Sequence, residues 1–129
     1  MYQAENSGLL SLSSRDLNAF KIVKPKTISE AVALLNDADS SPVAYAGGVD
    51  LVTAFRENKK IGTLVWLKEV DELSDISITK NTLRIGALIT HGQVSGNEKL
   101  SIITGLQDAW GQIANVRIRF SATIGGNLM

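Results

Sequence analysis

The chain has 129 residues with 13 basic and 13 acidic side chains, so its formal net charge is zero, and it contains no cysteine. A neutral chain has no overall field that attracts nucleic acid or an acidic membrane. The lack of cysteine excludes disulfides and cysteine-ligated iron–sulfur clusters within these residues. The apolar runs are too short to span a bilayer and the start lacks the basic region of a signal peptide, so we expect one cytoplasmic domain.

The N-terminal part of the chain predicts an arm followed by a strand and a helix. Residues 1–18 mix serines with a few leucines without a steady period, which is typical of an arm, and the domain is expected over residues 19–129. Apolar and polar residues alternate over residues 20–24, which predicts a short strand. Thr27 and Glu30 form a capping box, and the apolar residues behind it predict a helix.

Two buried strands are expected next, with a glycine turn between them. Short apolar runs at residues 43–46 and 63–67 predict these strands. Gly47 and Gly48 follow the first run and lead into a helical pattern over residues 50–58. This arrangement predicts a tight turn that delivers the chain into the N-terminus of a helix.

The second half of the chain predicts a hairpin and then helices. Residues 76–79 and 82–85 indicate two antiparallel strands around a Lys-Asn turn. Thr90 can cap a short helix, and a longer helix is expected over about residues 100–113. Residues 122–124 predict a brief extended piece before a second glycine pair. The fold class is therefore α/β (α+β), with a small three-stranded, mostly parallel sheet, flanking helices and a short antiparallel element.

The two glycine pairs are the candidates for an anion-binding site. Gly47 and Gly48, like Gly125 and Gly126, allow backbone amides to turn inward and approach a phosphate closely. An ordinary turn is the alternative at each pair, since glycine is a common way to leave a strand. Asp50 is expected in the first helical turn, where its carboxylate can satisfy free helix amides.

The remaining polar residues give no catalytic set and no metal site. His91 is the only histidine and is interpreted as a surface or cap residue. Arg117 and Arg119 are interpreted as solvated, with charge balance toward a cofactor as the alternative. Thr123 and Asn127 can donate to a phosphate or close a turn. No nucleophile elbow, Walker loop or G-x-G-x-x-G fingerprint occurs, so redox chemistry would require a bound cofactor.

Three segments occur in an order that resembles one family of flavoproteins. They read Ala46-Gly47-Gly48-Val49-Asp50-Leu51, then Ile85-Gly86-Ala87-Leu88-Ile89-Thr90, then Ala122-Thr123-Ile124-Gly125-Gly126-Asn127-Leu128, the last preceded by Ile118-Arg119. This order is similar to the FAD-binding domain of the molybdopterin dehydrogenase family, over residues 19–129. That family includes the flavin-carrying medium subunits of carbon monoxide dehydrogenase and the central domain of xanthine dehydrogenase. The resemblance implies the first subdomain of the FAD-binding PCMH-type fold.

The resemblance implies a site for FAD, with the diphosphate held by residues 44–51 and 123–127 and with residues 113–114 lying against the cofactor. The implied cofactor-binding residues are Ala44, Tyr45, Ala46, Gly47, Gly48, Val49, Asp50, Leu51, Ile113, Ala114, Thr123, Ile124, Gly125, Gly126 and Asn127. The implied partners are a molybdopterin-carrying large subunit and an iron–sulfur small subunit. Electrons would pass from the clusters through FAD to NAD, a quinone or another acceptor.

The chain departs from the family pattern at three points. Val49 and Phe120 stand where the family usually has polar residues. The chain also ends before the second, mainly antiparallel subdomain that encloses the flavin ring in the family. We therefore expect the isolated chain to hold FAD weakly or not at all and to be inactive alone.

Two alternatives stay open at this point. One is an FAD protein of the enolpyruvyl-glucosamine reductase and vanillyl-alcohol oxidase class. The other is a truncated, non-catalytic interaction module that binds a partner or associates with itself through an exposed apolar face.

Overall fold

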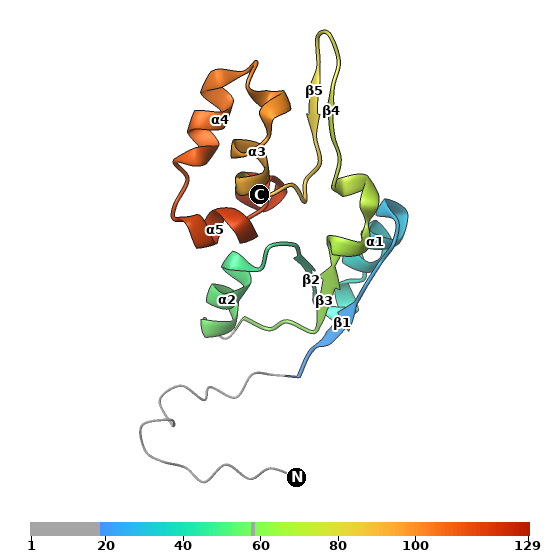
Figure 1. Cartoon of the computed structure of the whole chain (residues 1–129). Coiled ribbons are helices and arrows are strands. Elements are labelled where there is room, and N and C mark those ends of the chain that lie inside the picture. The colour runs from blue at the N-terminus through green and yellow to red at the C-terminus, as the bar shows by residue number, and fades with distance from the viewer. Residues whose placement is uncertain (1–18, 58) are drawn as a thin grey trace, which may run out of the picture.

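The computed structural model describes residues 19–57 and 59–129 (Figure 1). The arm expected over residues 1–18 lies outside the described residues. Two groups of elements make up the fold. A parallel sheet with its helices forms one group, and a hairpin and the C-terminal helices form the other (Figure 1).

The parallel sheet is confirmed. Its strands are β1 (Lys21–Val23), β2 (Pro42–Tyr45) and β3 (Thr63–Trp66), in the order β1-β3-β2. The central strand β3 pairs in parallel with both neighbours, and its Leu64 and Val65 are buried. A central parallel strand is covered on both faces, which explains why its sequence is a continuous apolar run.

Two helices flank this sheet, one on each side (Figure 1). The first, α1 (Ile28–Leu35), begins where the hydroxyl of Thr27 accepts a hydrogen bond from the Glu30 amide at 3.2 Å. Only half of the expected capping box forms, because the Glu30 carboxylate accepts from the Lys26 amide at 2.8 Å instead. The second helix, α2 (Val49–Arg56), follows Gly48 directly.

The antiparallel element is also confirmed. Strands β4 (Ile76–Ile78) and β5 (Leu83–Ile85) form a hairpin that extends away from the parallel sheet (Figure 1). It leads to α3 (His91–Ser95), where Thr90 and Gln93 form a complete capping box. A small core of buried apolar side chains holds this half together, namely Ile89, Val94, Leu100 and Ile124.

The C-terminal part differs from the sequence prediction in its helices. The long helix expected over residues 100–113 is shorter: a 3₁₀ turn at Glu98–Leu100 precedes α4 (Thr104–Gly111). The next segment, for which no element is predicted from the sequence, forms α5 (Val116–Ser121), capped by Asn115. The apolar side chains of Val116 and Phe120 are exposed, so α5 buries no apolar stripe that a sequence pattern could reveal.

The last helix, α6 (Ile124–Leu128), replaces the expected second glycine turn. The hydroxyl of Thr123 caps this helix and accepts from the Gly126 amide at 3.2 Å. Gly125 and Gly126 therefore lie inside α6, and the only glycine of the described residues with a positive φ is Gly48. The prediction of a second glycine turn is wrong, because a threonine N-cap favours a helix over a nest.

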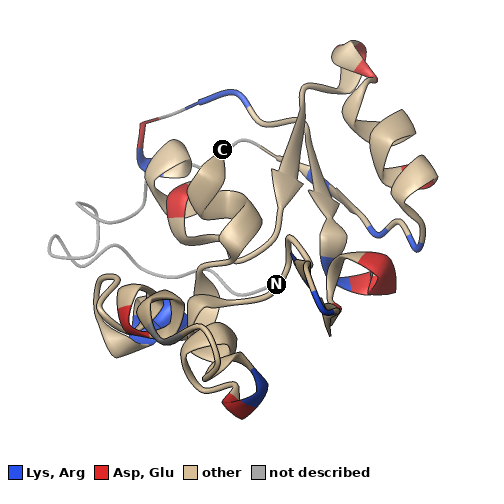
Figure 2. Ribbon diagram, turned by 90° about the horizontal axis from the view of Figure 1, so that it is seen from above, with Lys and Arg blue, Asp and Glu red and all other residues tan. Residues whose placement is uncertain are grey.

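The placement of charged residues and the lengths of the helices are consistent with the composition of the chain. Basic and acidic residues are interspersed along the ribbon of the described chain (Figure 2). No helix among the described residues is long and apolar enough to cross a membrane.

Candidate functional site

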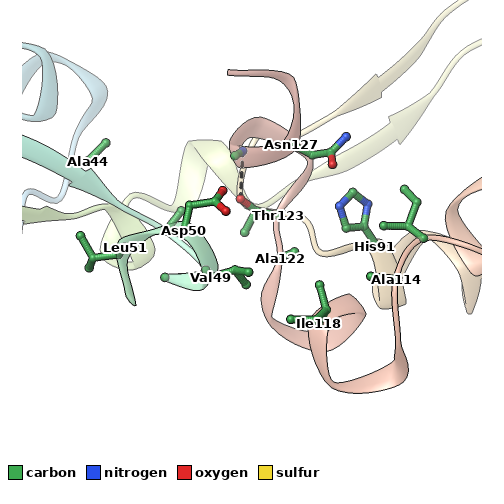
Figure 3. Close-up of a pocket in the computed structure, with 15 residues that line it drawn as sticks. Ala44, Val49, Asp50, Leu51, His91, Ala114, Ile118, Ala122, Thr123 and Asn127 are labelled. Atoms are coloured by element: carbon green, nitrogen blue, oxygen red, sulfur yellow. Dashed lines mark hydrogen bonds between the residues drawn. The ribbon is translucent and has the colours of Figure 1, made fainter. Parts of the chain in front are cut away.

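A cleft of about 310 Å³ lies between the two groups of elements (Figure 3). Three segments distant in the sequence meet there: the turn between β2 and α2, the turn before α5, and the start of α6. Its lining residues are Ala44, Ala46, Gly47, Gly48, Val49, Asp50, Leu51, His91, Ile113, Ala114, Ile118, Ala122, Thr123, Gly126 and Asn127. This volume is at the small end of the roughly 300–1,000 Å³ range of ligand pockets.

The N-terminus of α2 supplies free backbone donors on one side of the cleft. Gly48 is the N-cap with φ 76°, a left-handed conformation that glycine adopts without strain. Glycine has no side chain to accept from the first helix amides, and those of Val49, Asp50 and Leu51 have no partner among the described residues. Together with the helix dipole, these amides form a site suited to an anion.

Asp50 lies in the first turn of α2, as expected. Its carboxylate makes no hydrogen bond to the α2 amides in the described part of the chain, so the expected capping role is not seen. The residue is exposed, and solvent therefore screens its negative charge from the cleft.

Gly47 brings the two sides of the cleft together. A Cβ atom at this position would overlap the backbone carbonyl oxygen of Ser121, at the end of α5. The absence of a side chain thus allows the turn after β2 to pack directly against the segment that leads into α6. The glycine is required by backbone packing, apart from any role toward a phosphate.

The other side of the cleft offers side chains, because its backbone amides are already bonded. The amides of α6 pair as follows: Ile124 with the Ile89 carbonyl at 2.8 Å, Gly125 with the Ala87 carbonyl at 2.9 Å, Gly126 with the Thr123 hydroxyl at 3.2 Å, and Asn127 with the Thr123 carbonyl at 3.0 Å. The Thr123 hydroxyl proton and the Asn127 amide group are left as donors for a ligand.

The wall between these two sides is a strained turn held by an arginine. Ala114 has φ 46°, a left-handed conformation that costs a non-glycine residue about 1 kcal/mol or more. Arg119 Nη1 donates to the carbonyl oxygens of Ile113 at 2.9 Å and Ala114 at 3.0 Å. The interpretation of Arg119 as solvated is wrong, since its guanidinium is occupied by this turn, whereas Arg117 is exposed as expected.

His91 is also placed differently from the sequence interpretation. It is the first residue of α3, fully buried, and its imidazole lines the cleft (Figure 3). Neither ring nitrogen has a hydrogen-bond partner within the described residues. Burial lowers the pKa of His91 below its ordinary value, so the ring is neutral at pH 7. The surface interpretation is therefore wrong.

Most of the predicted site residues line this one cleft, and three do not. Tyr45 packs on Trp66, with ring centroids 5.9 Å apart. Ile124 is part of the buried core, and Gly125 packs against Ala87, whose Cβ would lie 2.8 Å from an added Cβ. The sequence did not single out His91, Ile118 and Ala122 as site residues, although each lies in or directly beside a segment that carries the resemblance.

The described residues contain no group of histidines and carboxylates that could hold a metal ion. The cleft also has no nucleophile with an adjacent base. Its chemistry is that of a binding site for an anionic group, with donors on both sides and apolar walls.

Fold and site together describe a small α/β domain with a cleft suited to an anionic group. The chain belongs to the family described as the FAD binding domain in molybdopterin dehydrogenase, which it matches over residues 18–129. FAD is accordingly the cofactor of the domain, and the donors at the start of α2 and beside α6 fit its diphosphate. The family resemblance read from the three sequence segments is confirmed.

Relatives and solved structures agree with this family. The chain is 37% identical to the nicotinate dehydrogenase FAD-subunit of Eubacterium barkeri over 112 residues, which cover 84% of the chain and 38% of that protein. It is 30% identical to the carbon monoxide dehydrogenase medium chain of Afipia carboxidovorans, covering 84% of the chain and 38% of that protein. The structure of quinoline 2-oxidoreductase from Pseudomonas putida 86 matches with a TM-score of 0.81 and 27% identity, covering 88% of this chain and 40% of that one. The chain thus spans less than half the length of these relatives.

Proposed function

We propose that this chain is the part of an FAD subunit that holds the cofactor's diphosphate in a molybdenum hydroxylase-type dehydrogenase. The observation that carries the proposal is the meeting of residues 44–51 with residues 113–127 around one cleft, with the free α2 amides on one side. The glycine turn before α2 is by itself compatible with an ordinary turn, and Gly125 and Gly126 lie inside α6. The convergence of the two segments on one cleft favours a shared ligand.

The chain's own residues would bind and position the cofactor. The amides of Val49, Asp50 and Leu51 would donate to one phosphate, while Thr123 and Asn127 would donate from the opposite wall. Bound FAD supplies the redox chemistry, which is the transfer of electrons between a donor and an acceptor. The protein would contribute position and electrostatics.

The names of two relatives support the proposal that this chain has partner subunits. One is a caffeine dehydrogenase subunit and another belongs to a 6-hydroxypseudooxynicotine dehydrogenase complex. We propose a molybdopterin-carrying subunit and an iron–sulfur subunit as partners. Electrons would pass from the iron–sulfur clusters through FAD to NAD, a quinone or another acceptor.

The proposal is tested by calorimetric titration of the 129-residue chain with FAD and, separately, with ADP. A site that holds mainly the diphosphate should bind both ligands weakly and with similar affinity, because no contact distinguishes the flavin. Gly48→Ala should weaken both, since it forces alanine to φ 76° and against the Tyr45 ring. Gly105→Ala, which meets nothing within 4 Å in α4, is the control. Submicromolar FAD binding with quenched flavin fluorescence would contradict weak binding, and no binding of either ligand would contradict the site.

A second candidate function is an interaction module, favoured by apolar side chains exposed next to the cleft. Val116, Phe120 and Leu128 on α5 and α6 are 57%, 71% and 79% exposed. Such side chains mark interaction surfaces when they gather on one face. Sedimentation of the ligand-free chain decides between the two: a stable dimer that binds no FAD favours the module, and a monomer that binds FAD favours the cofactor domain.

A further inference from the structure

His91 combines two properties that rarely occur together. Its side chain is completely buried, and both ring nitrogens lack a hydrogen-bond partner in the described part of the chain. Buried polar groups nearly always have a hydrogen-bond partner, so two buried nitrogens that both lack one require an explanation. An unfilled ligand position beside the ring is one such explanation.

The backbone around His91 fixes the ring relative to the ligand-facing segment. The His91 amide donates to the Ala122 carbonyl at 3.2 Å, and Thr90 forms an antiparallel bridge with Thr123. The start of α3 and the start of α6 are thereby held together. The imidazole faces the same cleft as Thr123 and Asn127 (Figure 3).

On the α6 side of the cleft, a bound anion depends on side chains for its hydrogen-bond donors. The backbone amides at residues 124–127 are all occupied by bonds within the protein. An anion held by the free α2 amides on the other side would therefore meet only side-chain donors here. His91 is the most buried polar side chain that lines the cleft, and its place in the fold is fixed.

We infer that His91 is a cofactor-binding residue, which donates a hydrogen bond from one imidazole nitrogen to a phosphate oxygen of the diphosphate. This inference rests on the proposed function of the cleft. A neutral imidazole carries one N–H donor, so it can bind an anion without bringing a buried positive charge into the empty cleft.

The ring is sealed from water, so a ligand reaches it through a small movement of the cleft wall. Asn127, whose side chain is exposed, lines the same cleft as His91.

Two charged residues are relevant to the protonation of this ring, Asp50 and Arg119. Asp50 is the charged residue among those that line the cleft, and it is exposed. On α5, which packs against α3, the Arg119 guanidinium is bonded to the carbonyls of Ile113 and Ala114. A bound phosphate would be the nearest unshielded negative charge, and it should raise the pKa of His91 above its value in the free chain.

Nuclear magnetic resonance of the wild-type chain tests this directly, because His91 is the only histidine and its Cε1–H signal is unique. The probes are inorganic pyrophosphate, ADP and FAD at concentrations up to millimolar. We expect the His91 signal to shift with each probe and its pKa to rise. Shifts of the Val49 and Leu51 amides without any shift of His91 would overturn the inference while leaving the proposed function intact. No shift anywhere would overturn both.

Two substitutions separate binding from packing. His91→Phe removes both nitrogens and keeps a planar ring, and His91→Gln keeps an amide donor. We expect His91→Phe to weaken ADP and pyrophosphate binding about tenfold or more, as for a lost hydrogen bond to a charged group, and His91→Gln to restore part of it. The unfolding midpoint of ligand-free His91→Phe should be equal or higher, since position 91 then carries no unpaired polar atom. Unchanged affinity in folded His91→Phe would show that the ring serves only for packing.

Discussion

Gly47 is the position where one added methyl group should separate the two sides of the cleft. Its Cβ would overlap the Ser121 carbonyl oxygen and lie 2.9 Å from the Ser121 carbonyl carbon. Both atoms belong to the backbone at the end of α5, so no side-chain rotation can relieve the contact. The φ of Gly47 is not in the left-handed region, so the cost of alanine comes from packing alone.

The magnitude follows from this contact. Forcing an extra carbon into a packed backbone contact costs about 1–3 kcal/mol of unfolding free energy. For a domain of this size, each kcal/mol lowers the melting temperature by roughly 4 °C. The turn after β2 must move away from α5, so the donors at Val49 and those at Thr123 and Asn127 also move apart. Both stability and ligand affinity should fall in Gly47→Ala.

The assay is urea unfolding followed by circular dichroism, with an ADP titration of the folded variant. Gly105→Ala is the matched control: it makes the same change in α4, where an added Cβ meets nothing within 4 Å. Alanine in a helix is favoured over glycine by about 0.5–1 kcal/mol, so this control should be more stable than the wild type. If Gly47→Ala is as stable as Gly105→Ala and binds ADP as the wild type does, the argument from close packing is wrong.

Three further predictions concern the helices around the cleft. Arg119→Met should lower the free energy of unfolding by about 1–2 kcal/mol and weaken ADP binding, because the turn at residues 113–114 loses both donors, whereas exposed Arg117→Met should do neither. The folded chain holds His91 neutral with a lowered pKa, so the unfolded chain takes up the proton first as the pH falls. The free energy of unfolding should keep its full value above pH 6.5, the ordinary histidine pKa, and should decline below that pH by at most about 1.4 kcal/mol per pH unit. His91→Phe should not show this decline. Leu100→Ala should cost about 2–5 kcal/mol, measured by its urea midpoint, because the side chain is fully buried.

The sequence by itself determined the elements whose signals are local. The apolar run at residues 63–67 predicts the central strand, observed over Thr63–Trp66, since a parallel strand is covered on both faces. Thr27 and Thr90 mark the starts of α1 and α3, because a capping hydroxyl acts within one helical turn. The order of the glycine-containing segments also indicated the FAD-binding family, which the comparison with known proteins confirms.

Only the tertiary structure decided how the site is built, because its parts are set by packing between distant segments. The Gly125 and Gly126 pair resembles a turn in sequence but lies in α6, where Thr123 caps the helix and Ala87 leaves no room for a side chain. His91 carries no sequence sign of burial, since its environment comes from α4 and α5, which pack against α3. The glycine turn after β2 and the donors Thr123 and Asn127 were therefore readable from the sequence, while the occupied backbone amides of α6 and the place of His91 in the cleft required the folded chain.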